Sequence, residues 1–294
     1  MTSQRRAYTA WVTVCLIWGT TYLGIRIALE SIPPLLMAGF RWLAAGAILL
    51  AILVARGERL PLRRTWGVLA VLGLLLLGLG NGGVVWAELT VPSGLTAVLV
   101  AASPFWMVGV ERFMRDSDRL TLRAAAGLAI GFGGIVALVW PEVGAGSGGR
   151  AFLVGVAATQ LACLGWALGS AYARRHDRHE NVLMAAAFEM LFGGMFLIAA
   201  GSLRHEWAKL AFTPRTAGAL TYLILFGAIA GFSAYAYALK HLPVATVSLY
   251  AYVNPIIAVA LGTLLLDEPF TPRAAAAAAV VLAGVAMVRP PYAR

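Results

Sequence analysis

The chain has 294 residues, of which 61% are hydrophobic and 12% are charged. Soluble domains carry about 25% charged residues, so a water-soluble globule of this composition would lack the polar groups to cover its surface. Its hydrophobicity also excludes a disordered chain. The two cysteines, Cys15 and Cys163, provide neither a disulfide framework nor a CxxC metal site. The composition therefore indicates a membrane protein with several spans.

The net charge of +10 comes mainly from arginine, since Lys209 and Lys240 are the only lysines. Such a charge could indicate nucleic-acid binding, which requires basic residues gathered on one polar face with interleaved aromatics. Here they lie in short loops between apolar runs, as in a membrane topology signal. We therefore expect a lipid bilayer, and no nucleic acid, as the surroundings of this chain.

Ten apolar runs approach the length of about 20 residues that a transmembrane helix needs. They cover residues 8–28, 35–55, 66–88, 94–113, 122–140, 151–173, 182–202, 215–239, 244–266 and 272–289. The runs do not alternate apolar and polar residues as barrel strands do. The sequence predicts an all-α polytopic protein with one five-helix repeat at 1–141, a glycine-rich connecting loop at 142–150 and a second repeat at 151–294.

The orientation follows from the distribution of basic residues. Arg5 and Arg6 precede the first run as in a secretory signal, but no small-x-small cleavage site follows, so we expect a retained span. With the amino end in the cytoplasm, 16 of the 23 Arg and Lys fall on the inner side and 7 on the outer side. This predicts a bacterial inner-membrane protein with both termini cytoplasmic. The outer segment with Arg204, Lys209 and Arg215 fits least well.

The two halves of the chain repeat each other at nearly constant spacing. Four residues recur 148 positions later: Cys15, Trp18, Phe40 and Gly46 as Cys163, Trp166, Phe188 and Gly194. Pro92 and Pro104 recur 151 positions later as Pro243 and Pro255. Five spans per half would invert the second half, and inverted repeats are typical of secondary transporters that work by alternating access. A duplicated bundle without transport is the alternative.

Several motifs resemble a known family. FRWLAAG at 40–46, AASPFW at 101–106, YVNPII at 252–257 and LLLDEPFTP at 264–272 resemble the ten-helix EamA-type members of the drug/metabolite transporter superfamily, over essentially the whole length. Asp118 stands where the second half has Glu268, which departs from the usual acidic turn. The resemblance implies export of amino acids, other metabolites or amphipathic toxic compounds from bacteria, and the YddG-type aromatic amino-acid exporters are the favoured comparison.

Two prolines stand in the middle of predicted spans. Pro104 and Pro255 each remove a helical hydrogen bond, and the preceding Ser103 and Asn254 could return one to the broken backbone. Both a static kink and a hinge that lines the transport path agree with this pattern.

Two charges lie inside predicted spans at equivalent repeat positions. Arg41 offers a fork of donors suited to a carboxylate, and Glu189 could exchange a proton if it is buried. Alternatively, Arg41 extends to the membrane surface and Glu189 bonds to a neighbouring helix. Charges in spans mark function or a partner, so both are candidate sites for ion coupling or carboxylate contact.

The remaining candidates for substrate binding are deep aromatic and amide side chains. A deep indole needs a protein or cavity partner for its N–H group, and amides can bind ammonium or carboxylate groups without carrying charge. The candidates are Trp18, Tyr22, Asn81, Trp106, Gln160, Trp166 and Tyr250. Ordinary helix packing is the alternative for each.

The chain carries no recognisable enzyme motif. No Gly–Lys pair marks a P-loop, HDRHE at 176–180 has the wrong spacing for HExxH, and Ser147 lacks the first glycine of GxSxG. We expect no catalytic residue, metal or cofactor. The prediction is a transporter that exports a small-molecule metabolite, preferably an aromatic or other apolar amino acid, driven by the substrate gradient or by protons. A broad exporter of drug-like or cationic compounds is the first alternative, and an intramembrane enzyme or lipid-handling scaffold is the second.

Overall fold

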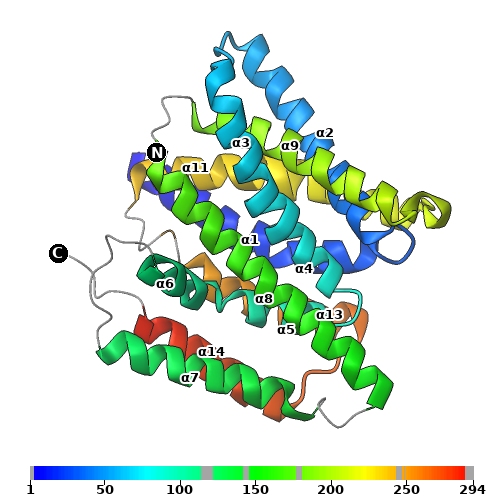
Figure 1. Cartoon of the computed structure of the whole chain (residues 1–294), viewed down its shortest axis with the longest axis vertical. Coiled ribbons are helices and arrows are strands. Elements are labelled where there is room, and N and C mark those ends of the chain that lie inside the picture. The colour runs from blue at the N-terminus through cyan, green and yellow to red at the C-terminus, as the bar shows by residue number, and fades with distance from the viewer. Residues whose placement is uncertain are drawn as a thin grey trace.

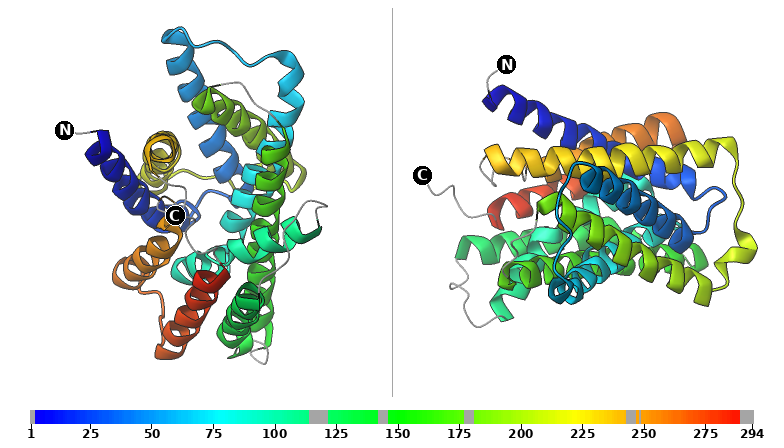
Figure 2. Two further views of the ribbon diagram at one scale, coloured as in Figure 1. Left: turned by 90° about the vertical axis from the view of Figure 1, so that its left-hand side faces the viewer. Right: turned by 90° about the horizontal axis from the view of Figure 1, so that it is seen from above.

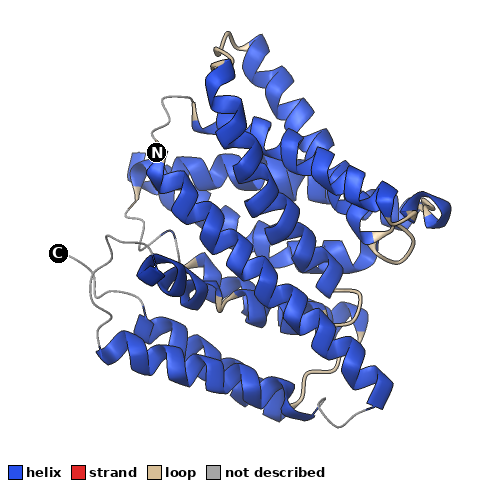
Figure 3. Cartoon of the chain, in the orientation of Figure 1, coloured by secondary structure: helices blue, strands red, loops and turns tan. Residues whose placement is uncertain are grey.

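The computed structural model describes residues 3–113, 122–141, 146–176, 181–242, 247 and 249–288. All regular structure in these ranges is helical (Figure 3). Seven helices are long and apolar enough to cross a bilayer, and three shorter apolar helices bring the number in the described residues to ten. The prediction of an all-α polytopic protein is confirmed. Asp118 and Pro243 lie outside the described residues.

The helices follow the predicted order along the chain. The first half begins with α1 (Ser3–Ala28) and α2 (Pro34–Ala55). One continuous helix follows, made of η1 (Arg63–Thr65), α3 (Trp66–Leu72), η2 (Gly73–Asn81) and α4 (Gly82–Ala87). The half ends with α5 (Ser93–Val100), α6 (Ser103–Phe113) and α7 (Leu122–Val139).

The second half begins with α8 (Gly146–Arg175), α9 (Val182–Leu203) and the short η4 (Glu206–Lys209). One continuous helix follows, made of α10 (Pro214–Tyr222), η5 (Leu223–Ala230) and α11 (Gly231–His241). The half ends with α13 (Tyr250–Leu266) and α14 (Pro272–Val288).

Three boundaries differ from those predicted. The predicted span at 94–113 divides into α5 and α6 at Ala101–Ala102, just before Pro104. Helix α8 begins at Gly146, so it extends into the segment predicted as a loop. The described part of the ninth span is α13, which begins at Tyr250. The break before Pro104 has a physical cause, because proline disfavours helical geometry in the residues before it.

Helices from the two halves pack in pairs. Helix α2 packs on α9, and α7 lies along α14 (Figure 1). Glycines permit both crossings, because a methyl group on Gly194 would meet the Leu43 backbone nitrogen at 2.7 Å and one on Gly284 would meet the Gly131 nitrogen at 2.5 Å. Without a hydrophobic drive between helices in lipid, such close backbone approach favours association. Gly131 therefore serves packing inside this chain.

Two apolar cores support the arrangement. One joins α1, α2, α9 and η5, and the second joins α5, α7, α8 and α14. The two cores lie in different groups of helices, and residues of α1, α5 and α13 connect the groups.

Two long π-helical segments occupy equivalent places in the halves. They are η2 at Gly73–Asn81 and η5 at Leu223–Ala230, which begin 150 positions apart, each within a membrane-crossing helix. The π-helix is rare, and when it interrupts an α-helix it frequently marks a functional site. The apolar sequence of these runs carries no signal for it, so this feature was not predicted.

Four interhelical loops meet at one end of the bundle, which we call the capped end: 29–33, 88–92, 204–213 and 267–271. The start of α1 and the end of α14 lie at the opposite end (Figure 2). Hydrogen bonds join the loops of the capped end to neighbouring helices, as described below. Successive helices therefore alternate in direction, as ten membrane crossings require.

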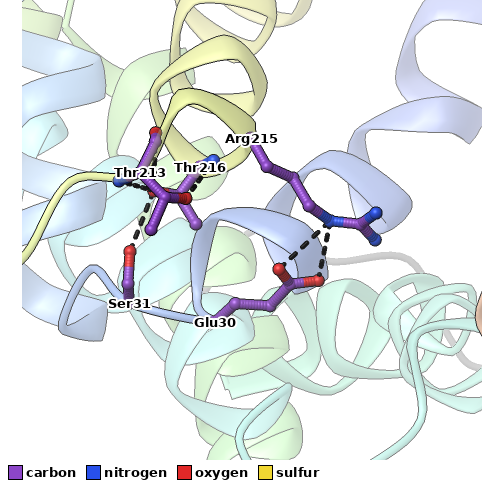
Figure 4. Close-up of polar contacts among 5 residues, drawn as sticks. All are labelled: Glu30, Ser31, Thr213, Arg215 and Thr216. Atoms are coloured by element: carbon purple, nitrogen blue, oxygen red, sulfur yellow. Dashed lines mark hydrogen bonds and ion pairs between the residues drawn. The ribbon is translucent and has the colours of Figure 1, made fainter.

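The link between α1 and α10 shows how the capped end is held (Figure 4). Thr213 and Thr216 form a reciprocal capping box at the start of α10, and Ser31 Oγ lies 2.9 Å from Thr216 Oγ1. Arg215 forms an exposed ion pair with Glu30 at 3.1 Å. Glu30 therefore balances the charge of Arg215, one of the basic residues that fit the predicted orientation least.

Candidate functional site

Helix α1 presents a stripe of polar and aromatic side chains to the centre of the molecule. Trp18, Tyr22 and Arg26 are spaced by four residues and therefore share one helix face. Helix α1 packs against α11 and α13 of the second half and also contacts α5. This stripe is therefore placed where the two groups of helices meet.

An aromatic cluster surrounds Trp18. The Trp18 ring centroid lies 5.5 Å from that of Phe232, 5.1 Å from Tyr235 and 5.0 Å from Tyr250. Two of these contacts are edge-to-face, an arrangement that aromatic quadrupoles favour. We call Trp18, Phe232, Tyr235 and Tyr250 the Trp18 cluster; all four are half-buried.

The π-helical segment η5 holds the indole of this cluster. Trp18 Nε1 donates a hydrogen bond to the Gly227 carbonyl at 3.2 Å. The irregular hydrogen bonding of a π segment can leave a carbonyl available to such a donor. Gly231, one turn later, leaves space for the indole, because a methyl group there would meet Trp18.

Arg41 adjoins the Trp18 cluster through the same glycine. A methyl group on Gly227 would lie 3.2 Å from Arg41 Nη2, and the guanidinium carbon lies 4.5 Å from the centroid of the Trp42 ring. Arg41 is 3% exposed, so it does not extend to the membrane surface. Its Nε and Nη1 atoms have no hydrogen-bond partner within the described ranges.

The predicted candidate Asn81 forms a hydrogen bond with Trp42, the residue next to Arg41. It ends η2, and its Oδ1 accepts a hydrogen bond from Trp42 Nε1 at 2.9 Å. Trp42 in turn contacts Phe232 of the Trp18 cluster edge-to-face, with ring centroids 5.9 Å apart. Asn81 therefore holds Trp42 in place beside the cluster.

Glu88 is a buried acid that the sequence analysis did not single out. It follows α4 directly, its side chain is 0% exposed, and neither carboxylate oxygen has a hydrogen-bond partner in the described part of the chain. Arg26 Nη1 donates instead to the Glu88 backbone carbonyl. The signal was present, because the predicted third span ran to residue 88 and so ended on this charge.

The other predicted aromatic candidates lie in a different group of helices. Trp106 Nε1 of α6 donates to Gln160 Oε1 of α8 at 2.9 Å, and Trp166 of α8 packs against Gly80 of η2. Among the described residues, the ring contacts of Trp18 are with Phe232, Tyr235 and Tyr250, and Trp166 is not one of them.

The residues before the two prolines make equivalent contacts in the two halves. Ser103 Oγ donates to Val100 O at 2.6 Å and to Cys163 Sγ at 3.3 Å. Asn254 Nδ2 donates to Tyr250 O at 3.1 Å and to Cys15 O at 3.2 Å. Each therefore returns a hydrogen bond to the backbone that precedes its proline, and each also reaches a cysteine of the other half. Helix α13 remains continuous through Pro255, whereas the first-half span is broken just before Pro104.

Glu189 lies in the first half of α9, the part of this helix that is farther along the chain from the capped-end loop 204–213. Its side chain is half-buried. A methyl group on Gly73 would lie 2.5 Å from the Glu189 carbonyl oxygen, so this part of α9 packs closely on the start of η2.

A carboxylate from the second half caps α5 of the first half. Glu268 accepts hydrogen bonds from Ser93 N at 2.9 Å, Gly94 N at 3.2 Å and Ser93 Oγ at 2.9 Å. An anion is favoured there by the positive end of the helix dipole and by the free N–H groups of the first turn. Helix α5 also packs on α13 and α1, whereas α6 packs on α8. The two groups of helices are therefore joined at the capped end.

A second carboxylate repeats this device on α2. Glu206 Oε2 accepts hydrogen bonds from the backbone N–H groups of Leu35 and Leu36, both at 3.0 Å. Glu206 is buried and belongs to η4 of the second half. No three His, Cys, Asp or Glu side chains gather among the described residues as a metal site would require.

Comparison with known proteins places these features in a family. The EamA-like transporter family matches residues 5–140 and again residues 153–289. The chain is 40% identical to the uncharacterized inner membrane transporter YedA of Escherichia coli K12 over 93% of this chain and 87% of that protein. It is 24% identical to a probable amino-acid metabolite efflux pump of Salmonella typhimurium, over 92% of this chain and 91% of that protein.

A solved structure has a similar fold. Its crystal structure superposes with a TM-score of 0.62 at 22% identity, over 97% of this chain and 96% of that one. At this identity the likeness concerns the fold alone.

Proposed function

The chain belongs to the EamA-like transporter family, and we propose that it exports small amphipathic metabolites, preferentially aromatic and other apolar amino acids, from the bacterial cytoplasm. The observation that carries the proposal is that the Trp18 cluster and Arg41 both adjoin Gly227. Aromatic rings suit an apolar side chain, and a guanidinium suits a carboxylate.

Two further observations support this substrate class. The site residues lie where α1 meets helices of the other half, and inverted-repeat transporters bind substrate at the repeat interface. A relative with 24% identity is named as a probable amino-acid metabolite efflux pump. Transport by alternating access would then separate α5 from α13 and α1 at the capped end.

The orientation is part of the proposal. We place both termini in the cytoplasm and the capped end outside, because the majority of basic residues then lie on the cytoplasmic side. A fluorescent or phosphatase reporter fused to the C-terminus, and the same reporters inserted at 205–210, should report opposite sides of the membrane.

Proton exchange is a candidate driving force, with Glu189 as the predicted acid within a span. Glu189→Gln should abolish the pH dependence of export if this carboxylate carries the proton, because an amide does not titrate in this range. Export into vesicles over a pH series tests this, with the exposed Glu58→Gln as the matched control. Unchanged pH dependence in Glu189→Gln would remove Glu189 from coupling.

A broad exporter of cationic compounds is the second candidate function. The observation that favours it is the buried Glu88 carboxylate in a molecule whose α1 stripe also carries aromatic rings, since rings and carboxylates both attract cations. The two functions differ in the charge of the substrate that crosses the membrane.

Flux into sealed liposomes tests the proposal. The purified protein is reconstituted and given labelled Trp, Thr and a lipophilic cation in parallel. We expect Trp to move fastest, because its ring suits the Trp18 cluster. Movement of the cation alone would support the second function, and absence of all amino-acid flux would overturn the first. Trp18→Ala, with Trp207→Ala as an exposed control, should reduce Trp flux if the cluster binds substrate.

A further inference from the structure

Two oppositely charged side chains, one on α2 and one directly after α4, are buried without completed hydrogen bonds, and these two helical segments pack on each other. Glu88 is 0% exposed and Arg41 is 3% exposed. Both Glu88 carboxylate oxygens and two Arg41 nitrogens lack a hydrogen-bond partner in the described ranges. Buried polar groups are ordinarily satisfied, so each exception requires an explanation such as a ligand.

Two other charged side chains near Glu88 make hydrogen bonds to the backbone. Glu268 accepts the hydrogen bonds of the α5 N-terminus, and Arg26 donates to the Glu88 backbone carbonyl. Glu88 and Arg41 are the charged side chains in the described ranges with buried atoms that lack a hydrogen-bond partner.

We propose that Glu88 and Arg41 bind the ammonium and the carboxylate of one zwitterionic substrate molecule, with its apolar side chain against the Trp18 cluster. This rests on the proposed function and specifies how the site recognises an amino acid. A lone cation would pair only with Glu88, and a lone anion would pair only with Arg41. A zwitterion offers three ammonium donors to Glu88 and two carboxylate oxygens to the Arg41 fork, and it adds no net charge to the interior.

The α1 stripe connects the two parts of this site. Tyr22 lies one turn from Trp18 and one turn from Arg26. Arg26 of this stripe donates to the Glu88 backbone carbonyl, and Trp18 belongs to the Trp18 cluster. A methyl group on Gly227, whose carbonyl accepts from Trp18, would lie 3.2 Å from Arg41 Nη2. The charged groups thus adjoin the aromatic cluster on both the α1 and the η5 sides.

Competition by charge-deleted analogues tests the pair. Uptake of labelled phenylalanine into liposomes is measured with unlabelled phenylalanine, phenylalanine amide and N-acetylphenylalanine as competitors. The amide lacks the carboxylate and the N-acetyl compound lacks the ammonium. For the wild type we expect each analogue to compete about tenfold or more weakly than phenylalanine, since each loses a charge-assisted hydrogen bond.

The variants should act crosswise. Arg41→Gln should lose the discrimination against the amide and keep that against the N-acetyl compound, and Glu88→Gln should do the reverse. A purely structural role would weaken all three competitors together. Arg56→Gln, directly after the same helix, and Glu58→Gln, both exposed, serve as charge-matched controls. Where a Gln variant does not fold, Arg41→Lys and Glu88→Asp are measured in its place, with the same crosswise shift expected in weaker form.

The outcomes separate the two proposals. Wild-type phenylalanine transport with the crosswise pattern supports both. Transport with discrimination unchanged in the variants, or lost equally for both analogues, overturns the zwitterion site and leaves the proposed function standing. If the wild type neither transports nor binds phenylalanine, the proposed function fails and this assignment fails with it.

Discussion

At the scale of single residues, two glycines of one helix decide where Trp18 lies. Gly227 supplies the carbonyl that accepts the indole N–H, and Gly231 leaves the space that the ring occupies. A side chain at Gly231 would compete with the indole for this volume, whereas one at Gly227 would meet Thr21 and Arg41. The position of the indole therefore depends on the absence of a side chain at Gly231.

Gly231→Ala should displace Trp18 and reduce amino-acid flux. A methyl group at this position would lie 3.0 Å from Trp18 Cδ1 and closer still to Nε1, so the indole would lose its bond to Gly227. Flux into liposomes provides the measurement. Gly218→Ala is the control, because a methyl group there meets nothing within 4 Å. Equal flux in both variants would contradict a substrate-binding role for the Trp18 cluster.

At the scale of helices, second-half carboxylates hold the start of first-half helices. Glu268 caps α5 and Glu206 caps α2. Both helices start at the capped end immediately after a proline, so their first N–H groups need external acceptors. The caps therefore join the halves through helix ends as well as through apolar packing.

Glu268→Gln should lower the stability of the protein. The amide keeps only one acceptor oxygen, so at least one of the three donors at the start of α5 loses its partner, at a cost of about 1 to 3 kcal/mol. Thermal unfolding in detergent measures the change. Asp267→Asn removes the same charge one residue earlier, and Asn tolerates the left-handed backbone there, where φ is 52°. A lower melting temperature is expected for Glu268→Gln alone.

Gly284→Ala should loosen the crossing of α7 and α14. A methyl group at residue 284 would lie 2.5 Å from the Gly131 nitrogen, so the helices would have to separate. Overpacking of this kind costs about 1 to 3 kcal/mol. Gly133→Ala, on α7, is the control because that position faces open space. The melting temperature should fall for Gly284→Ala only. Equal melting temperatures of the two variants would contradict the tight crossing.

At the scale of the whole molecule, Ser103 of the first half bonds to the Cys163 thiol of the second half, and Asn254 of the second half bonds to the Cys15 carbonyl of the first half. The halves differ in the state of their fourth spans, since the first-half span is broken and the second-half helix α13 is continuous. Helix α5 then packs across on α13 at the capped end. Alternating access would require this contact to open.

Gly94→Ala should disturb the crossing of α5 and α13 at the capped end. A Cβ on Gly94 would lie 2.8 Å from Val259 Cα and 2.9 Å from Val259 Cγ2, so the two helices would have to separate. Overpacking of this kind costs about 1 to 3 kcal/mol. Thermal unfolding in detergent measures the change, with Gly109→Ala as the control because a methyl group there meets nothing within 4 Å. Equal melting temperatures of the two variants would contradict the close crossing.

The sequence by itself determined the helical class, the ten apolar runs and the family resemblance, because span length and apolar composition are local properties that the bilayer imposes. It also identified Trp18, Asn81 and Arg41 as polar or aromatic groups that need partners. Only the tertiary structure decided which partners they have: Trp18 bonds to a π-helical carbonyl 209 positions away, Asn81 holds Trp42, and Arg41 stays buried. These contacts join distant segments, and a π segment leaves no periodic signal in a uniformly apolar helix.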